Sequence, residues 1–254
     1  MPVVLIEKPN PKVTIVTLNR PERRNALTVQ LLNELQAAIK VASDQPEERI
    51  LILRGAGDAF CAGLDLKEAA RASGAHATAE MVARTLIMLS ATNLITIAAV
   101  HGAAVAGGAG IMSACDFVVA AEGTKIGYPE VRRGLVAALV LTFLRRQVRE
   151  RPIRELLFGG ELIDAQRARE IGLVNRVVPA ADVMGEAQKF ADLVLQGAPS
   201  AVVESKRLIA ELFPTSVKDD IERALKYHMQ ARESAEAREG IAAFNEKRKP
   251  KWAV

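Results

Sequence analysis

The residues best suited to hold a negatively charged oxygen form one run of Gly and Ala in the middle of the chain. A β-type segment at 94–100 leads directly into the run at 100–110, and a helix-compatible segment follows at 108–114. Glycines let a ligand approach main-chain N–H groups, and the first N–H groups of a helix are unpaired and carry about +0.5 of partial charge. Such a turn stabilises an oxygen that bears negative charge. The alternative, which the turn alone leaves open, is that Gly and Ala only allow close packing of buried elements.

Glu130 is the carboxylate best placed for proton transfer. It follows Pro129, which fixes the chain before it, and apolar segments flank it. Apolar surroundings disfavour the charged form of a carboxylate and bring its pKa toward the pH at which it can shuttle a proton. The alternative is a structural glutamate that caps a helix or pairs with Arg132 or Arg133, and position alone leaves both interpretations open.

The histidines, the cysteines and the missing motifs limit the kinds of catalytic or binding site that the sequence predicts. His76 lies in an Ala-rich loop, His228 in a late helix, and His101 at the end of a buried strand, where we expect a structural hydrogen bond rather than catalysis. Cys61 and Cys115 are far apart without metal-ligand spacing, so we expect two buried thiols and no metal site. The sequence lacks G-x-S-x-G, G-x-x-x-x-G-K-[ST] and G-x-G-x-x-G, which disfavours serine hydrolases, P-loop enzymes and standard dinucleotide sites.

Composition and charge indicate a globular protein. The 254 residues are 50% hydrophobic and 25% charged, which disfavours disorder. The net charge of +4 is mildly basic, and the basic residues are dispersed, so we expect no nucleic-acid partner, although this charge also suits a small ligand that carries phosphates. No apolar run approaches the roughly 18 to 20 residues of a membrane span. Because a signal peptide is also missing, we expect no membrane partner and a cytoplasmic location.

The elements that must position these groups follow from the hydrophobic pattern. A Pro-interrupted loop at 8–11 is predicted to join two strands in a hairpin, and Thr28 is expected to cap the next helix. The continuous apolar run at 49–54 predicts a strand buried on both faces. Residues 69–79 are expected to form a mobile loop that acts as a lid beside the site.

The remaining pattern predicts an α/β fold, either a spiral of β-β-α turns or another layered core, with a helical layer at the end. A short extended piece at 125–131 is expected to stop at Pro129. The other predicted strands and helices lie, in order, at 3–7, 13–18, 31–42, 78–90, 94–100, 108–114, 115–121, 139–148, 153–158, 174–178, 182–195, 198–212, 217–229 and 235–247.

The motifs of the chain, taken in order, resemble those of the crotonase (enoyl-CoA hydratase/isomerase) superfamily. The resemblance extends over essentially the whole chain. Any one motif is weak, but their order and spacing together are highly specific. The matching segments are 18–21 (Leu-Asn-Arg-Pro), 25–27 (Asn-Ala-Leu), 59–67 (Ala-Phe-Cys-Ala-Gly-Leu-Asp-Leu-Lys), 101–102 (His-Gly), 107–108 (Gly-Gly), 115–116 (Cys-Asp), 129–130 (Pro-Glu), 134–135 (Gly-Leu) and 239–250.

The resemblance implies an acyl-CoA thioester as substrate and an enolate-like intermediate. In the family, two backbone N–H groups hold the thioester oxygen, and they correspond here to Leu64 and Gly107, with Glu130 as the acid/base. The resemblance implies no cofactor beyond the CoA of the substrate, and it implies that the basic end at 247–249 assists from a neighbouring subunit. The residues that it assigns to CoA binding are Arg23, Arg24, Ala62, Asp65, Leu66 and Lys67.

One position departs from the family pattern. Hydratases of the family carry a glutamate three residues beyond the oxyanion glycine, and that position is Gly110 here, whereas their other glutamate is present as Glu130. Addition of water normally uses both carboxylates, but shifting a double bond between carbons 3 and 2 needs only one. The single glutamate therefore favours isomerisation, or another proton transfer at the α-carbon, over hydration. The rival interpretation is a non-catalytic member that keeps the fold as a scaffold or as a nucleic-acid-binding protein.

The resemblance also predicts how the chain is organised. It implies a crotonase-like spiral core over residues 1–195 and a C-terminal helical trimerisation region over residues 196–254, both in one family unit. The family forms trimers that often pair into hexamers, so a homotrimer or hexamer is expected. The length and branching of the acyl chain are expected to depend on the segment at 69–90.

Overall fold

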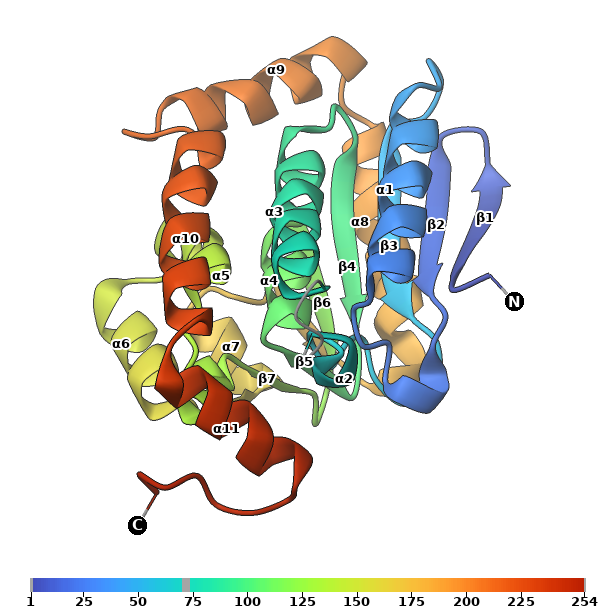
Figure 1. The fold of residues 1–254 in the computed structure, drawn as a ribbon. Coiled ribbons are helices and arrows are strands. Elements are labelled where there is room, and N and C mark those ends of the chain that lie inside the picture. The colour runs from blue at the N-terminus through green and yellow to red at the C-terminus, as the bar shows by residue number, and fades with distance from the viewer. Residues whose placement is uncertain (1, 70–73, 254) are drawn as a thin grey trace.

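The computed structural model describes residues 2–69 and 74–253, which form an α/β core (Figure 1). The main sheet has the strand order β1-β2-β3-β4-β6-β9, in which β1 and β2 are antiparallel and the later pairs are parallel. A smaller sheet has the order β5-β7-β8. The strands are β1 (Val4–Asn10), β2 (Val13–Leu18), β3 (Ile50–Gly55), β4 (Ile95–Val100), β5 (Ala103–Val105), β6 (Phe117–Ala121), β7 (Lys125–Gly127), β8 (Leu162–Asp164) and β9 (Arg176–Val178).

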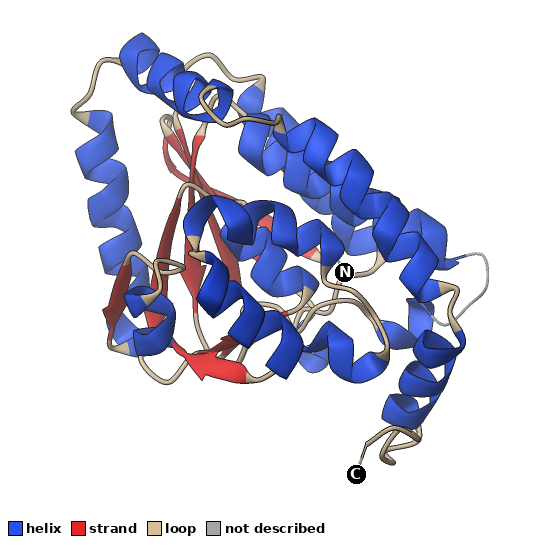
Figure 2. Cartoon of the chain, turned by 90° about the vertical axis from the view of Figure 1, so that its left-hand side faces the viewer, coloured by secondary structure: helices blue, strands red, loops and turns tan. Residues whose placement is uncertain are grey.

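Helices cover both faces of the main sheet, as Figures 1 and 2 show. The α-helices are α1 (Val29–Ser43), α2 (Leu66–Ala69), α3 (Gly74–Ala91), α4 (Gly107–Ser113), α5 (Ala138–Gln147), α6 (Glu150–Gly159), α7 (Ala165–Glu170), α8 (Val183–Leu195), α9 (Pro199–Glu211), α10 (Val217–Arg232) and α11 (Ala235–Asn245). The 3-10 turns are η1 (Pro21–Arg23), η2 (Pro129–Arg133) and η3 (Ala180–Asp182).

Alternate residues of the central strands belong to two hydrophobic cores. Leu51 and Leu53 of β3 pack in the core that also contains residues of α1 and α3, whereas Ile50 and Ile52 pack in the core that contains residues of α8. Side chains of a strand point alternately to its two faces, so a strand between two cores needs a continuous apolar run. The prediction that the run at 49–54 is a strand buried on both faces is confirmed.

The N-terminal hairpin differs from the prediction. β1 continues through Pro9, and the turn lies at Pro11 and Lys12, so the predicted loop at 8–11 is wrong. Pro9 is tolerated because β1 is an edge strand and its register with β2 is irregular between Glu7 and Asn10. A proline at such a place costs the sheet little, since its missing N–H breaks no regular ladder bond.

The helix starts near the site are mostly as predicted. Thr28 caps α1, because its Oγ1 accepts a hydrogen bond from Leu31 N at 3.2 Å. The loop predicted at 69–79 is wrong over its second part, since α3 already begins at Gly74. The Ala-rich sequence there favours helix intrinsically, which the presence of Gly and Ser obscured. The rest of that loop, 70–73, lies outside the described residues.

Three short elements depart from the predicted pattern. The piece predicted as extended at 125–131 is β7 followed by η2, which Pro129 begins. Proline suits the first position of a helical turn, because its φ is fixed and its missing N–H would be unpaired there. The strand β8 and the helix α7 were not predicted, since each is too short to show a period.

The C-terminal helices pack on the same core. α10 lies against α3 and α5, and α11 lies against η2, so both reach the side of the molecule where the glycine-rich turn ends (Figure 1). The division of the chain at 195/196 and the trimerisation role of its last part stay predictions. Within the described ranges, every helix is too short or too polar to cross a bilayer.

Candidate active site

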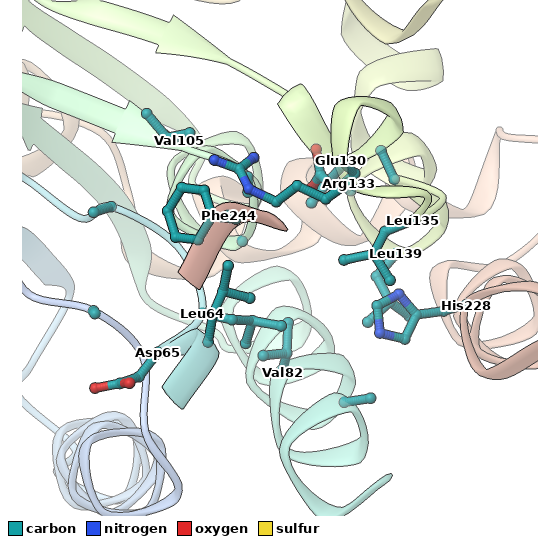
Figure 3. Close-up of a pocket in the computed structure, with 18 of the residues that line it drawn as sticks. Leu64, Asp65, Val82, Val105, Glu130, Arg133, Leu135, Leu139, His228 and Phe244 are labelled. Carbon is teal, nitrogen blue, oxygen red and sulfur yellow. The ribbon is translucent and has the colours of Figure 1, made fainter. Parts of the chain in front are cut away.

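A cavity of about 370 Å³ lies between the glycine-rich turn, η2 and the C-terminal helices (Figure 3). Leu64 and Gly107, the two predicted N–H donors, line this cavity, and so does Glu130. Apolar side chains from α3, from α5 and the segment before it, and from α11 form much of the wall: Val82, Leu135, Leu139, Val140 and Phe244. The structure therefore brings the three predicted catalytic residues into one apolar cavity.

Backbone hydrogen bonds hold the turn before Leu64 against the glycine-rich turn. Cys61 N donates to Ala103 O, and Val105 N donates to Cys61 O, each at 3.0 Å. Gly63 has φ +91°, and a Cβ added there would lie 2.9 Å from Val105 O, so only glycine fits. The same added Cβ would lie 3.6 Å from the backbone nitrogen of residue 107. The two predicted donors are therefore close in space although far apart in sequence.

The N–H groups of Leu64 and Gly107 are available to a ligand. Among the hydrogen bonds of the described residues, none uses either group as donor. Gly107 begins α4, and the residue before it, Ala106, has φ 51° and ψ −122°, a conformation that non-glycine residues rarely adopt. Backbone strain of this kind clusters at functional sites, where the surrounding structure holds it in place. The start of α4 is thus a rigid, unpaired donor site.

The carboxyl group of Glu130 is buried and incompletely bonded. It lies in the first turn of η2, and its Oε2 has no hydrogen-bond partner among the described residues. Burial raises its pKa from 4.5 to about 7, outweighing a backbone hydrogen bond of the residue itself and the charge of Arg133, which both lower it. At neutral pH the group is therefore close to half ionised, which suits it to accept and return a proton.

The arginines after Glu130 are engaged elsewhere. Arg132 donates to Gly159 O at 3.0 and 3.1 Å. The guanidinium of Arg133 lies 4.4 Å from the centre of the Phe244 ring, and neither arginine forms an ion pair with Glu130 in the part of the chain that the structure describes. This arrangement disfavours the interpretation of Glu130 as an ion-paired structural residue.

An aliphatic side chain fills the position of the missing glutamate. Gly110 is buried in α4, and Val140 of α5 lies directly over it. A Cβ added to Gly110 would lie 2.5 Å from Val140 Cγ1, closer than real Cβ atoms approach their neighbours. A carboxylate at this position would therefore fit only if Val140 moved.

Asp65, the remaining carboxylate among the described lining residues, is held away from Glu130. Its Oδ2 lies 3.3 Å from Arg20 Nη2. Its Oδ1 accepts hydrogen bonds from Lys67 N at 3.2 Å and from Glu68 N at 3.3 Å, at the start of α2. Figure 3 shows its side chain pointing away from Glu130. Asp65 therefore holds the start of α2 in place, whereas Oε2 of Glu130 has no partner among the described residues.

Comparison with known proteins agrees with this geometry. A family model described as Enoyl-CoA hydratase/isomerase matches residues 8–254. The chain belongs to the enoyl-CoA hydratase/isomerase family. This family lies in the crotonase superfamily, so the resemblance predicted from the motifs is confirmed.

Individual relatives of this enoyl-CoA hydratase/isomerase family member match it from end to end. A protein of Thermus thermophilus, whose name gives enoyl-CoA hydratase as a provisional assignment, is 38% identical, and the match covers 98% of this chain and 100% of that protein. The crotonyl-CoA hydratase of Syntrophomonas wolfei is 33% identical over 97% of this chain and 96% of its own length. The crystal structure of an enoyl-CoA hydratase from Mycobacterium avium has a TM-score of 0.86 at 32% identity and 99% coverage of both chains. The predictions of a crotonase-like α/β fold and of an enzyme of this family are confirmed.

The residues assigned to CoA binding from the family resemblance lie mostly at the cavity. Arg23, Ala62, Asp65, Leu66 and Lys67 line it, and the side chains of Arg23 and Lys67 are exposed, as groups that contact phosphates need to be. Arg24 does not line the cavity. It has a left-handed conformation with φ 49°, and its carbonyl accepts a hydrogen bond from Ala62 N at 3.0 Å. The CoA-binding role of these residues stays a prediction.

Part of the cavity wall of this family member was missed by the sequence analysis. His228 of α10, together with Phe244 and Asn245 of α11, lines the cavity. Nothing local in the sequence marks these positions, because they reach the site only when the C-terminal helices fold back onto η2 and α5. Ala79 and Val82 line it from α3, within the segment expected to shape the acyl-chain site.

His101 and the two cysteines are not among the residues that line the cavity. His101 Nε2 lies 2.8 Å from Gly57 O, which confirms the structural hydrogen bond expected at the strand end. Cys61 and Cys115 are buried free thiols, and burial raises the pKa of each to about 12, so neither is a reactive thiolate. The side chain of His76 lies outside the described residues.

Proposed function

We propose that this enzyme binds acyl-CoA thioesters and moves their double bond from position 3 to position 2 of the acyl chain. The reaction is a proton transfer that passes through an enolate intermediate. One observation carries the proposal: the buried carboxyl of Glu130, whose Oε2 has no partner among the described residues, lies in the same cavity as Leu64 and Gly107, whose N–H groups donate no hydrogen bond there. A Cβ at Gly110, the position of a second carboxylate, would collide with Val140. The arrangement supplies one base and one site for an oxyanion, which is what isomerisation needs.

The Leu64 and Gly107 N–H groups hold the thioester oxygen in this mechanism. When the proton leaves carbon 2, the electron pair of the C–H bond delocalises onto that oxygen, which becomes negatively charged. Two fixed donors, one of them at the start of α4, stabilise this charge without having to reorganise. Removing one such donor typically costs a factor of about 10² to 10³ in rate.

Glu130 moves the proton. Its ionised carboxylate takes a proton from carbon 2 of a 3-enoyl-CoA ester, and the carboxyl group formed returns it to carbon 4, so that the double bond ends between carbons 2 and 3. Its pKa of about 7 lets the same group act as base and then as acid at neutral pH. The apolar side chains of the cavity wall disfavour water beside the carboxyl, where water would compete for the proton.

Hydration of a 2-enoyl-CoA ester is the second candidate reaction. It is favoured by the name of the Syntrophomonas wolfei relative, a crotonyl-CoA hydratase. Hydration requires a group that orients the attacking water, and Val140 lies against the position that the Cβ of a second glutamate at residue 110 would take. We therefore rank hydration below isomerisation.

We also propose the binding mode and the assembly of the enzyme. The CoA moiety lies along Arg23, Ala62 and Lys67 at the cavity mouth, and CoA is the only cofactor-like group involved, as part of the substrate. The assembly is a homotrimer or hexamer, which the exposed apolar residues of α9 support. A cytoplasmic location is supported by the free cysteine thiols, since such thiols are typical of a reducing compartment.

Replacement of Glu130 by Gln tests the proposal. The Glu130→Gln variant keeps the shape of the side chain but removes the base, so isomerisation of 3-enoyl-CoA esters is expected to fall by a factor of about 10² to 10⁴ while the esters still bind. Steady-state kinetics with titration calorimetry measure the two effects. If the variant turned over the esters at the wild-type rate, Glu130 would not be the catalytic base.

A further inference from the structure

His228 of α10 brings a polar ring into the apolar part of the cavity. It lines the cavity together with Leu135 and Leu139, and Figure 3 shows its ring extending from α10 toward these side chains. Only 7% of the residue is exposed. The ring has no role in the proposed proton transfer, which uses Glu130.

One nitrogen of the His228 ring lacks a partner. The ring forms a hydrogen bond with the backbone of Val136, but Nε2 is buried and has no hydrogen-bond partner among the described residues. The bond to Val136 therefore uses Nδ1. Buried polar atoms in native proteins are nearly always hydrogen-bonded, so an unpaired nitrogen on the wall of a substrate cavity indicates that a ligand supplies its partner.

The protonation of the ring decides which chemical group that partner is. Burial, and then the charge of Arg232, lower the pKa of His228 to about 4, so the ring is neutral at neutral pH. The bond to Val136 favours the protonated ring, so its acceptor is the carbonyl and Nδ1 carries the hydrogen. Nε2 is left with a lone pair only. The matching ligand group is a donor, and the charge of Arg232 favours a neutral hydroxyl over a cationic amine.

We propose that His228 determines substrate specificity, its Nε2 accepting a hydrogen bond from a hydroxyl group on the acyl chain of the CoA ester. This inference rests on the proposed function, since it requires an acyl-CoA ester in this cavity. The preferred substrates carry a hydroxyl on the part of the chain distant from the thioester, whereas an unsubstituted chain leaves Nε2 unpaired. Because Nε2 is buried, a hydroxyl reaches it only when the atoms that cover it move.

The experiment compares ω-hydroxyacyl-CoA esters of increasing chain length with the unsubstituted ester of each length. Saturated chains are used, so that titration calorimetry measures binding without turnover. At one or more chain lengths, the wild type is expected to bind the hydroxylated ester about tenfold more tightly than its parent. His228→Phe keeps an aromatic ring without the acceptor, so the ratio of the two affinities is expected to fall to about one. His228→Gln restores an acceptor and is expected to recover part of the preference.

The outcomes separate this inference from the proposed function. Tight binding of the parent esters without any preference for a hydroxyl in the wild type overturns the role of His228 and leaves the acyl-CoA function standing. A preference that persists in folded His228→Phe also overturns it. If no CoA ester binds at all, the proposed function fails, and this inference fails with it. The comparison of hydroxylated and unsubstituted esters on the wild-type enzyme tests the role of His228 even if a variant does not fold.

Discussion

The proposed role of Glu130 as the base predicts that turnover depends on pH. A carboxyl with a pKa of about 7 must lose its proton before it can act as the base. The kcat/KM for isomerisation is therefore expected to rise as the pH increases through about 7 and to level off above about 8, which a pH–rate profile measures. A profile that stays flat between about pH 5 and 8 would contradict the assignment, since a carboxyl with an ordinary pKa would be fully ionised over most of that range.

The same pKa makes Glu130 a source of instability at high pH. Its pKa of about 7 in the folded chain exceeds the ordinary 4.5, so the folded state holds the proton more tightly. The stability that this proton provides is fully present below about pH 4.5 and is lost as the pH rises through about 7. Glu130→Gln removes the buried charge and is expected to raise the unfolding free energy at pH 8 by up to about 3 kcal/mol, with little change near pH 5. Urea unfolding at both pH values measures this difference, and an equal effect at both would refute it.

The contact between Gly110 and Val140 limits the chemistry. Gly110→Glu alone forces a side chain against Val140 and is expected to destabilise the protein by about 1 to 3 kcal/mol or more. The double variant Gly110→Glu with Val140→Gly opens space for the carboxylate, and its rate of hydration relative to isomerisation is expected to rise. Val140→Gly alone is the matched control. A ratio unchanged from that control would show that this position does not decide between the two reactions.

At the scale of elements, Cys61 pairs with β5 and Leu64 pairs with Leu27, and these two contacts hold the turn that carries the Leu64 N–H. Gly63→Ala would drive a Cβ into Val105 O, so the donor is expected to shift and kcat to fall by a factor of about 10². Gly123→Ala is the matched control, because Gly123 also has positive φ but has open space around its Cβ position. Equal loss of activity in the two variants would mean that backbone strain alone, and not the donor, causes the effect.

The elements predicted correctly are those with strong local signals. Short runs of consecutive residues predict the Thr28 cap and the apolar strands β3 and β4. β8 and the path of β1 through Pro9 were not predictable, because a three-residue strand shows no period and an edge strand tolerates proline. These errors follow from pairing with other strands, which local pattern does not report.

The candidate site divides in the same way. Leu64, Gly107 and Glu130 were predicted as site residues from the glycine-rich turns, the Pro-Glu step and the family resemblance. The structure places all three at one cavity, and their catalytic roles stay proposals. The filling of the Gly110 position by Val140, and the presence of His228 in the wall, depend on how α5 and α10 pack. The sequence could show that a carboxylate is missing at Gly110, but only the structure shows that no space remains for one.

At the scale of the whole molecule, exposed apolar residues at the end of α9 support the proposed assembly. The exposed fractions of Leu208, Ile209 and Leu212 are 53%, 64% and 76%. Single exposed apolar residues are normal on a monomer, but a group of neighbouring ones is typical of a surface that binds another protein. Light scattering is expected to give the mass of a homotrimer or hexamer, and Leu212→Asp is expected to shift the enzyme toward smaller species. A monomeric wild type at assay concentration would contradict this proposal.

We propose that one carboxylate and a backbone oxyanion site make this enzyme a faster isomerase than hydratase. The most direct measurement follows a 3-enoyl-CoA ester with the purified wild-type enzyme by proton NMR, with Glu130→Gln as control. We expect the 2-enoyl-CoA ester to accumulate and the 3-hydroxyacyl-CoA ester to form far more slowly, with neither product formed at a comparable rate by the variant. Conversion of the 2-enoyl-CoA ester to the 3-hydroxyacyl-CoA ester as fast as it appears would contradict the claim.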